Sequence, residues 1–212
     1  SPLVTAALPK SYMDNYTEKE LYDLKTSAGM LVPCLDMMVK GLDTGVEVAW
    51  NGADMGEVCL RGPWIADEYY KDPERSKATF RDGWLHTGDI ATIDSEGYIR
   101  LVDRTKDLIK SAGEWISSVD LENEIMSHPK VMEAAVIGMP HEKWQERPLA
   151  CVVPAPDAAG SVTEEEIIDY LKERVAKWWV PDRIVFLEAI PKTSVGKFDK
   201  KALRATVLPR IA

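Results

Sequence analysis

A short, mostly charged segment between two apolar runs constrains the fold of this chain more than any other feature. Residues 97–102 begin as an alternating apolar strand, and residues 103–107 then read Asp-Arg-Thr-Lys-Asp. A second apolar run, interrupted by Gly113, follows as far as Ile116. Such a break predicts either a solvated loop or a joint between two domains, and we expect its charges to keep it in contact with water.

Length and composition exclude several classes of protein. The 212 residues can form one large domain or two small ones, and the net charge of −9 argues against a general nucleic-acid binder. No apolar run approaches the roughly 18–20 residues that a membrane-spanning helix needs. Cys34, Cys59 and Cys151 lack the spacing of metal ligands or of a disulfide framework. They predict reduced thiols, a cytoplasmic location and no metal site in this chain.

The residues before the charged break predict a small antiparallel β structure. Strand-length runs occupy residues 35–40, 46–50 and 57–61, and turn-forming sequences separate them. This pattern favours an antiparallel meander or a small barrel. Thr17 and Asp72 each begin a capping pattern, which predicts two short helices that end at about residue 27 and about residue 80.

The sequence from residue 84 to residue 103 predicts a β-hairpin. If Ser95 and Glu96 form a two-residue turn, Ile93 faces Tyr98, whereas a three-residue turn would change which side chains share a face. Asp89 and Arg104 then lie on one face at the open end of the hairpin. A carboxylate in that position can hold two vicinal ribose hydroxyls, and a structural Asp–Arg pair is the alternative.

The residues after the charged break alternate strands with helices, which predicts a compact α+β unit. Expected helices begin at Ser117, at Thr163 and at Asp199, and the second should continue at helical spacing through Trp178. Expected strands occupy residues 131–139, 148–153 and 183–187. Because the two halves differ in architecture, we interpret the break as a joint between residues 1–105 and residues 106–212.

A polar loop at residues 191–197 ends in Gly196-Lys197. It fails the test for a nucleotide-binding P-loop, because position 191 is not glycine and Lys197 is followed by Phe198. Two interpretations stay open for Lys197. It is either a solvated lysine before a helix or a mobile ammonium that stabilises charge on a phosphate or carboxylate.

Taken together, these segments resemble the adenylate-forming superfamily, which includes acyl-CoA synthetases, firefly luciferase and peptide-synthetase adenylation domains. Four segments carry the resemblance in the family's order: Gly56-Glu57-Val58-Cys59-Leu60-Arg61-Gly62-Pro63, Trp84-Leu85-His86-Thr87-Gly88-Asp89, Asp103-Arg104-Thr105-Lys106-Asp107 and residues 191–197. Residues 110–122 and 144–148 are similar to medium- and long-chain fatty-acyl-CoA synthetases in particular.

The resemblance implies a fold and a reaction. Residues 1–105 would be the C-terminal part of the large AMP-binding domain, mainly its β-barrel-like subdomain, and residues 106–212 the small mobile α+β lid. The reaction would be ATP-dependent fatty acid–CoA ligation: a carboxylate forms an acyl-adenylate and pyrophosphate, and the CoA thiol then displaces AMP. ATP, Mg²⁺ and CoA would take part beside the fatty acid, and a homodimer is compatible with the family.

The resemblance also implies roles for single residues. Asp89 would hold the ribose hydroxyls, with Arg104 supporting the ribose. Lys197 would bridge the fatty carboxylate and the α-phosphate, and Lys106 would be the hinge of the lid. The second half-reaction would use a group of neighbouring residues, namely Gly113 in the pantetheine tunnel, Glu114 and Trp115 beside it, and Lys110 near the adenylate.

The chain also departs from the family pattern. It contains neither the Ser/Thr/Gly-rich phosphate loop nor the Thr-Glu motif whose glutamate serves Mg²⁺, and Ala112 stands where many relatives have glycine. We therefore expect a C-terminal fragment that is inactive alone. Two alternative functions remain: acyl loading of a carrier protein, and a non-catalytic interaction module with the same fold.

Overall fold

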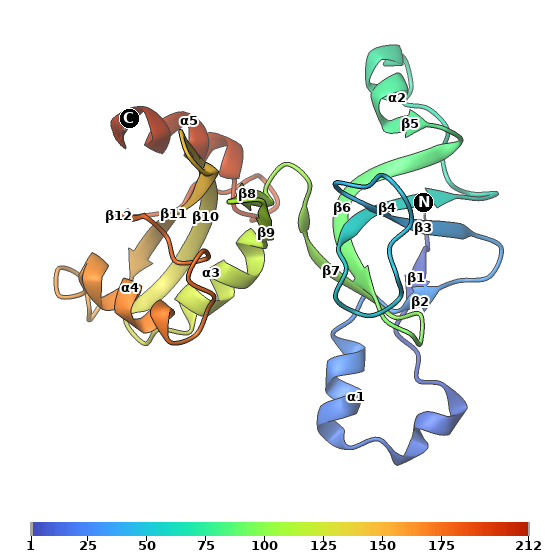
Figure 1. Ribbon diagram of the computed structural model, residues 1–212, viewed down its shortest axis with the longest axis horizontal. Coiled ribbons are helices and arrows are strands. Elements are labelled where there is room, and N and C mark those ends of the chain that lie inside the picture. Colours follow the sequence, from blue (N-terminus) through green and yellow to red (C-terminus); the bar gives the residue numbers. More distant parts are fainter. Residues whose placement is uncertain (1, 212) are drawn as a thin grey trace. The chain divides into compact units, whose positions relative to one another are not determined.

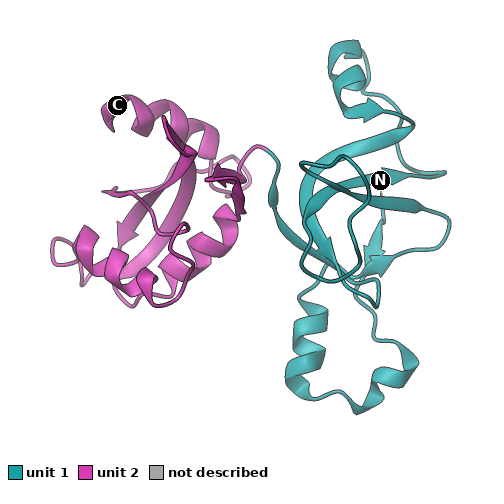
Figure 2. Cartoon of the chain, viewed as in Figure 1, with its two compact units in different colours: residues 1–105 teal, residues 106–212 magenta. Residues whose placement is uncertain are grey.

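The computed structural model describes residues 2–211 and divides the chain into two compact units (Figure 2). Unit 1 comprises residues 1–105 and unit 2 comprises residues 106–212. Both units mix helices with mainly antiparallel strands, so the predicted α+β class is confirmed. Among the described residues, every helix is too short or too polar to span a bilayer.

Unit 1 is built around one antiparallel sheet. Its elements are β1 (Thr5–Ala6), the 3-10 helix η1 (Ser11–Asn15), α1 (Glu18–Lys25), β2 (Met30–Leu31), β3 (Asp36–Gly41), β4 (Gly56–Arg61), α2 (Pro73–Thr79), β5 (Phe80–Arg81), β6 (Trp84–Ile93) and β7 (Ile99–Arg104). The sheet order is β3-β4-β6-β5, and β7 also pairs with β6 (Figure 1). Within residues 2–211 it stays an open meander and does not close into a barrel.

The core of unit 1 follows from the alternation of side chains along these strands. Val58 and Leu60 of β4 are buried against Ala91 and Ile93 of β6 and against Ile99 of β7. Burying such side chains contributes about 1.5–3 kcal/mol each, which is what holds the sheet together. The two predicted helices are present, and each begins at its expected cap residue.

The strand expected at residues 46–50 is wrong. That segment makes one isolated bridge, Lys40 with Glu47, and two backbone bonds to β3. The Gly41 amide donates to the Val46 carbonyl at 2.7 Å, and the Val48 amide donates to the Val39 carbonyl at 2.9 Å. The residues at its two ends are largely exposed, Val46 to 62% and Trp50 to 49%. An apolar run that finds no partner strand over its full length cannot complete a ladder.

The two-residue turn on which one hairpin register depended is wrong, but Asp89 and Arg104 still lie together. The turn is longer than two residues, so Ile93 pairs with Ile99 and not with Tyr98. A register shift between Ile90 and Ala91 then brings Asp89 directly opposite Arg104. Such a bulge places one extra residue on one strand and re-aims the side chains beyond it.

Unit 2 is a second sheet covered by helices. Its elements are β8 (Ile109–Ser111), β9 (Glu114–Ile116), α3 (Ser118–Met126), β10 (Val131–His141), β11 (Gln145–Pro154), α4 (Glu164–Lys172), β12 (Arg183–Phe186) and α5 (Lys200–Ile211). The sheet order is β10-β11-β8-β9, and β12 pairs with β11 in parallel.

Successive residues of β10 face opposite sides of this sheet, which gives unit 2 two apolar layers. Ala134 and Val136 belong to the cluster that contains residues of α3 and α4. Ala135 and Ile137 belong to the cluster formed with α5. Figure 1 shows α3 and α4 on one side of the β10–β11 pair and α5 on the other.

The helix that starts at Thr163 is shorter than its apolar spacing predicts. It ends at Lys172, because the Leu171 carbonyl accepts bonds from the amides of both Arg174 and Val175 and so tightens the chain into a turn. Val175 still packs on the core from this turn. Helical spacing of apolar residues therefore continues beyond the helix itself.

The charged break is only partly solvated, which corrects our expectation. Arg104, Thr105 and Lys106 are exposed, but Asp103 and Asp107 are each only 8% exposed. Asp103 Oδ1 accepts a bond from the Arg104 amide at 2.7 Å, and Asp107 Oδ1 accepts one from Arg204 of α5 at 2.9 Å. Hydrogen-bond partners within the protein thus replace water around the two carboxylates.

Candidate functional site

Asp89 and Arg104 form an ion pair at the open end of the β6–β7 hairpin. Arg104 Nε lies 2.7 Å from Asp89 Oδ1, and the predicted contact is therefore present. The Asp89 side chain keeps 34% of its surface exposed and that of Arg104 keeps 55%. The pair can therefore reach a solute, and a carboxylate next to a guanidinium offers both acceptors and donors to a sugar.

Glu57 of β4 binds the peptide next to this pair. This role was not predicted from the sequence. Glu57 Oε1 accepts a bond from the Gly88 amide at 3.1 Å, and its Oε2 lies 2.8 Å from His86 Nδ1. Gly88 lies directly before Asp89 and has a positive φ of 73°, a conformation that glycine adopts without steric cost. The only signal was that Glu57 belongs to a segment carrying the family resemblance.

Glu57 and His86 also lie close to a cysteine, and together they form a group of possible metal ligands. Glu57, Cys59 and His86 each place one ligand atom within 4.8 Å of the others. Burial and the nearby charge of Glu57 raise the pKa of the Cys59 thiol to about 11, so the thiol is protonated in the structure as it stands. The Glu57 carboxylate is also occupied by its two hydrogen bonds. Glu57 therefore connects His86 to the peptide that precedes Asp89.

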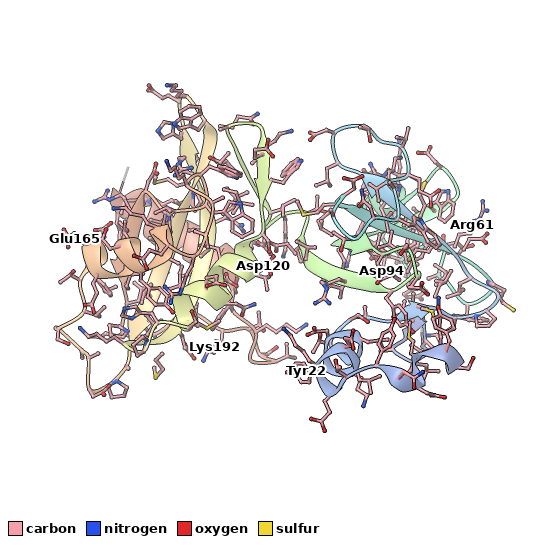
Figure 3. All side chains as sticks on the ribbon, turned by 60° about the horizontal axis from the view of Figure 1, so that its bottom comes forward. Tyr22, Arg61, Asp94, Asp120, Glu165 and Lys192 are labelled. Carbon is pink, nitrogen blue, oxygen red and sulfur yellow. The ribbon has the colours of Figure 1, made fainter. Side chains whose placement is uncertain are left out.

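Lys197 is exposed at the end of a closed loop. Thr193 organises this loop: its amide donates to the Lys197 carbonyl at 2.7 Å, and its carbonyl accepts from the Gly196 amide at 2.9 Å. Lys192, labelled in Figure 3, pairs with Phe198 across the base of the loop. Among the described residues the Lys197 ammonium makes no ion pair, so it is available to an anion.

The hairpin formed by β8 and β9 carries the four residues expected to serve the second half-reaction. Gly113 has a φ of +89°, and a Cβ added there would meet no atom within 4 Å. Glu114 is exposed beside it. Lys110 and Trp115 pair across the two strands, with the Lys110 ammonium 4.5 Å from the Trp115 ring centroid. The structure thus brings all four onto one short hairpin.

Lys106 is the first residue of unit 2, at the boundary of the two units. Its side chain is exposed, while its carbonyl accepts a bond from Arg204 at 3.0 Å. Arg204 also holds Asp107, so the chain is tied to α5 directly after the boundary. Sequence patterns gave no indication of this contact, because 98 residues separate its partners.

Residues 120–197 match the family described as "AMP-binding enzyme C-terminal domain". The long-chain-fatty-acid–CoA ligase of Thermus thermophilus is 50% identical over 206 residues, covering 96% of this chain. The 3-methylmercaptopropionyl-CoA ligase of Ruegeria lacuscaerulensis is 42% identical over 207 residues, with the same coverage. This chain spans 37% of each relative.

A solved structure agrees with these relatives. The ATP-bound MatB from Rhodopseudomonas palustris superposes with a TM-score of 0.78 at 31% identity, over 88% of this chain and 37% of that one. The chain belongs to the adenylate-forming superfamily. The predicted membership is thereby confirmed. The adenylate-forming relatives include CoA ligases for more than one acid, so the family does not by itself specify the acid.

Proposed function

We propose that this chain is the C-terminal part of an ATP-dependent fatty acid–CoA ligase. The observation that carries the proposal is the exposed Lys197, held on a closed loop with no competing ion pair among the described residues. The 50% identity with a long-chain-fatty-acid–CoA ligase supports a fatty acid as the substrate.

In the first half-reaction, a carboxylate oxygen attacks the α-phosphorus of ATP. A P–O bond forms, the bond to the bridging oxygen breaks, and pyrophosphate leaves. We assign Lys197 to this step, because an ammonium between the carboxylate and the α-phosphate offsets the negative charge that both reactants carry. Asp89 accepts hydrogen bonds from the ribose hydroxyls, and Arg104 keeps its carboxylate oriented.

In the second half-reaction, the CoA thiol gives its proton to water and its sulfur attacks the acyl carbon. The bond between the acyl carbon and the phosphate oxygen breaks, and AMP leaves. We assign the β8–β9 turn to this step. Gly113 would leave room for pantetheine, with Glu114 and Trp115 beside it and Lys110 near the adenylate. Lys106 would be the hinge about which the lid rotates, so that the β8–β9 turn replaces the Lys197 loop at the reacting groups. Residues at the ends of elements can absorb such rotations.

Unit 1 would be the end of the large AMP-binding domain and unit 2 the mobile lid. We propose that Mg²⁺ is held outside this chain, because the carboxylate on the nucleotide side, Asp89, is already paired with Arg104. We also propose that the 212-residue chain alone forms no acyl-CoA, for lack of the triphosphate-binding loop. The three free cysteines favour the reducing cytoplasm.

Lys197→Ala in the complete enzyme tests the proposal. We expect pyrophosphate exchange to fall by about 10²–10³-fold, while thioester formation from supplied acyl-adenylate stays near wild type. A matched control is Lys201→Ala, which removes an exposed lysine four residues away. Equal loss in both half-reactions, or no loss in either, would contradict the role of Lys197.

The two alternative functions make different predictions. A carrier-loading enzyme would use a holo-carrier protein thiol in preference to CoA, so an assay with both acceptors separates it from a CoA ligase. An interaction module would exchange no pyrophosphate with any carboxylic acid. Such a module would not need Asp89, Arg104 and Lys197 in positions that a solute can reach.

A further inference from the structure

The β8–β9 turn is fastened to the far end of the β10–β11 hairpin. The Ala112 amide donates to the Trp144 carbonyl at 3.2 Å, and Ser111 pairs with Gln145. The Lys110 amide donates to Glu146 Oε2 at 3.2 Å. The turn therefore takes its position from the segment around residues 144–147.

Arg147 completes this attachment. Its Nη1 donates to Ser111 Oγ at 3.0 Å, and its side chain is only 12% exposed. The same guanidinium donates to the carbonyls of Trp178 and Val180 at 2.7 and 2.9 Å, and its Nε lies 2.8 Å from Asp182 Oδ1. One planar fork thus joins the end of β8, the start of β11 and the connection that follows α4.

The turn needs this external support because its own conformation is unfavourable. Ala112 and Gly113 both have positive φ, at 55° and 89°, and for an alanine that region is strained. No atom comes within 4 Å of a Cβ built at Gly113, so side-chain packing does not hold the turn on that side. Its shape depends on the bonds made by Ser111, Ala112 and Lys110.

We propose that Arg147 is a positioning residue for thioester formation: by holding Ser111, it fixes the β8–β9 turn in the shape that admits the CoA thiol. This inference rests on the proposed function of Gly113. A lysine could not replace Arg147, because an ammonium lacks the planar fork that reaches three segments at once. The Lys197 loop has its own bonds through Thr193 and does not depend on Arg147.

Amide hydrogen exchange on the 212-residue chain tests the positioning without any assay of activity. In Ser111→Ala we expect exchange at Ala112 and Lys110 to be faster by about tenfold, with Gly196 unchanged. Arg147→Met should do the same to a greater extent. Asp182→Asn is the control, because it removes the ion pair and keeps the Ser111 bond. Equal exchange at Ala112 in wild type and Ser111→Ala would overturn the proposal.

Kinetics of the complete enzyme test the consequence for catalysis. Ser111→Ala should raise the KM for CoA by about fivefold or more and leave pyrophosphate exchange within about twofold of wild type. A variant that merely loses stability would lower both half-reactions together. If amide hydrogen exchange at Ala112 changes while the KM for CoA does not, the proposed role of Arg147 in thioester formation is wrong. Failure of the wild-type enzyme to exchange pyrophosphate would instead refute the proposed function.

Discussion

Several residues that carry a Cβ adopt left-handed backbone, and two of them lie at or beside the β8–β9 turn. Ala112 adopts it in the β8–β9 turn, and Gln145 adopts it in the hairpin end to which that turn is attached. Such residues persist only where the surrounding hydrogen bonds outweigh the strain.

Ala112→Gly should stabilise the chain by about 1 kcal/mol, because glycine reaches a positive φ without the Cβ conflict. The free energy of unfolding, measured by urea denaturation, checks this expectation. The control is Ala205→Gly in the exposed middle of α5, which should destabilise by about 1 kcal/mol. Destabilisation by both substitutions would show that Ala112 carries no strain.

At the scale of elements, α3 and α5 are joined by a buried ion pair. Lys200 Nζ lies 2.7 Å from Glu122 Oε1, with side-chain exposures of 9% and 8%. Lys200 also donates to Ser118 Oγ, and Glu122 Oε1 accepts the Val136 amide at 2.8 Å. The pair therefore links the start of α5 to α3 and β10, across the sheet that both helices cover.

Lys200→Met should destabilise the chain by about 3–5 kcal/mol, because it leaves the Glu122 carboxylate buried without its cation. The double variant Glu122→Gln with Lys200→Met should recover much of this loss, since glutamine still accepts the Val136 bond. Lys172→Met removes an exposed partner of Asp169 and should cost at most about 1 kcal/mol. Urea denaturation of these variants and of Glu122→Gln gives the free energies of unfolding. If the losses of the two single variants simply add in the double variant, Glu122 and Lys200 are not coupled.

At the scale of the whole molecule, each unit has its own core. The clusters around Ile93 and Tyr98 contain only residues of unit 1, and those around Ile125 and Leu203 contain only residues of unit 2. A chain organised in this way can fold in two steps, because the buried apolar surface of one unit does not depend on the other.

Residues 106–212 expressed alone should therefore fold. We expect a single cooperative unfolding transition that coincides with one of the transitions of the 212-residue chain. Circular dichroism and urea titration of both chains provide the comparison. A truncated chain that is unfolded, or one whose midpoint is far lower than either transition, would show that unit 2 depends on unit 1.

Local chemistry in the sequence was sufficient for much of the fold. The caps at Thr17, Asp72 and Ser117 begin helices where predicted, and the apolar runs in residues 131–139 and 148–153 form the two long strands of unit 2. These signals act over a few residues, through bonds that a capping side chain makes to its own first turn. The family resemblance rests on equally local segments.

Tertiary structure alone decided the details of the candidate site. The bulge before Ala91 sets Asp89 opposite Arg104, Glu57 holds the Gly88 amide from 31 residues away, and Arg147 reaches Ser111 over 36 residues. Pattern and spacing carry no information about such pairs, because their geometry depends on how separate strands pack. The sequence named Asp89, Lys197 and Gly113, and the packed units supply the residues that hold two of them, Asp89 and Gly113, in place.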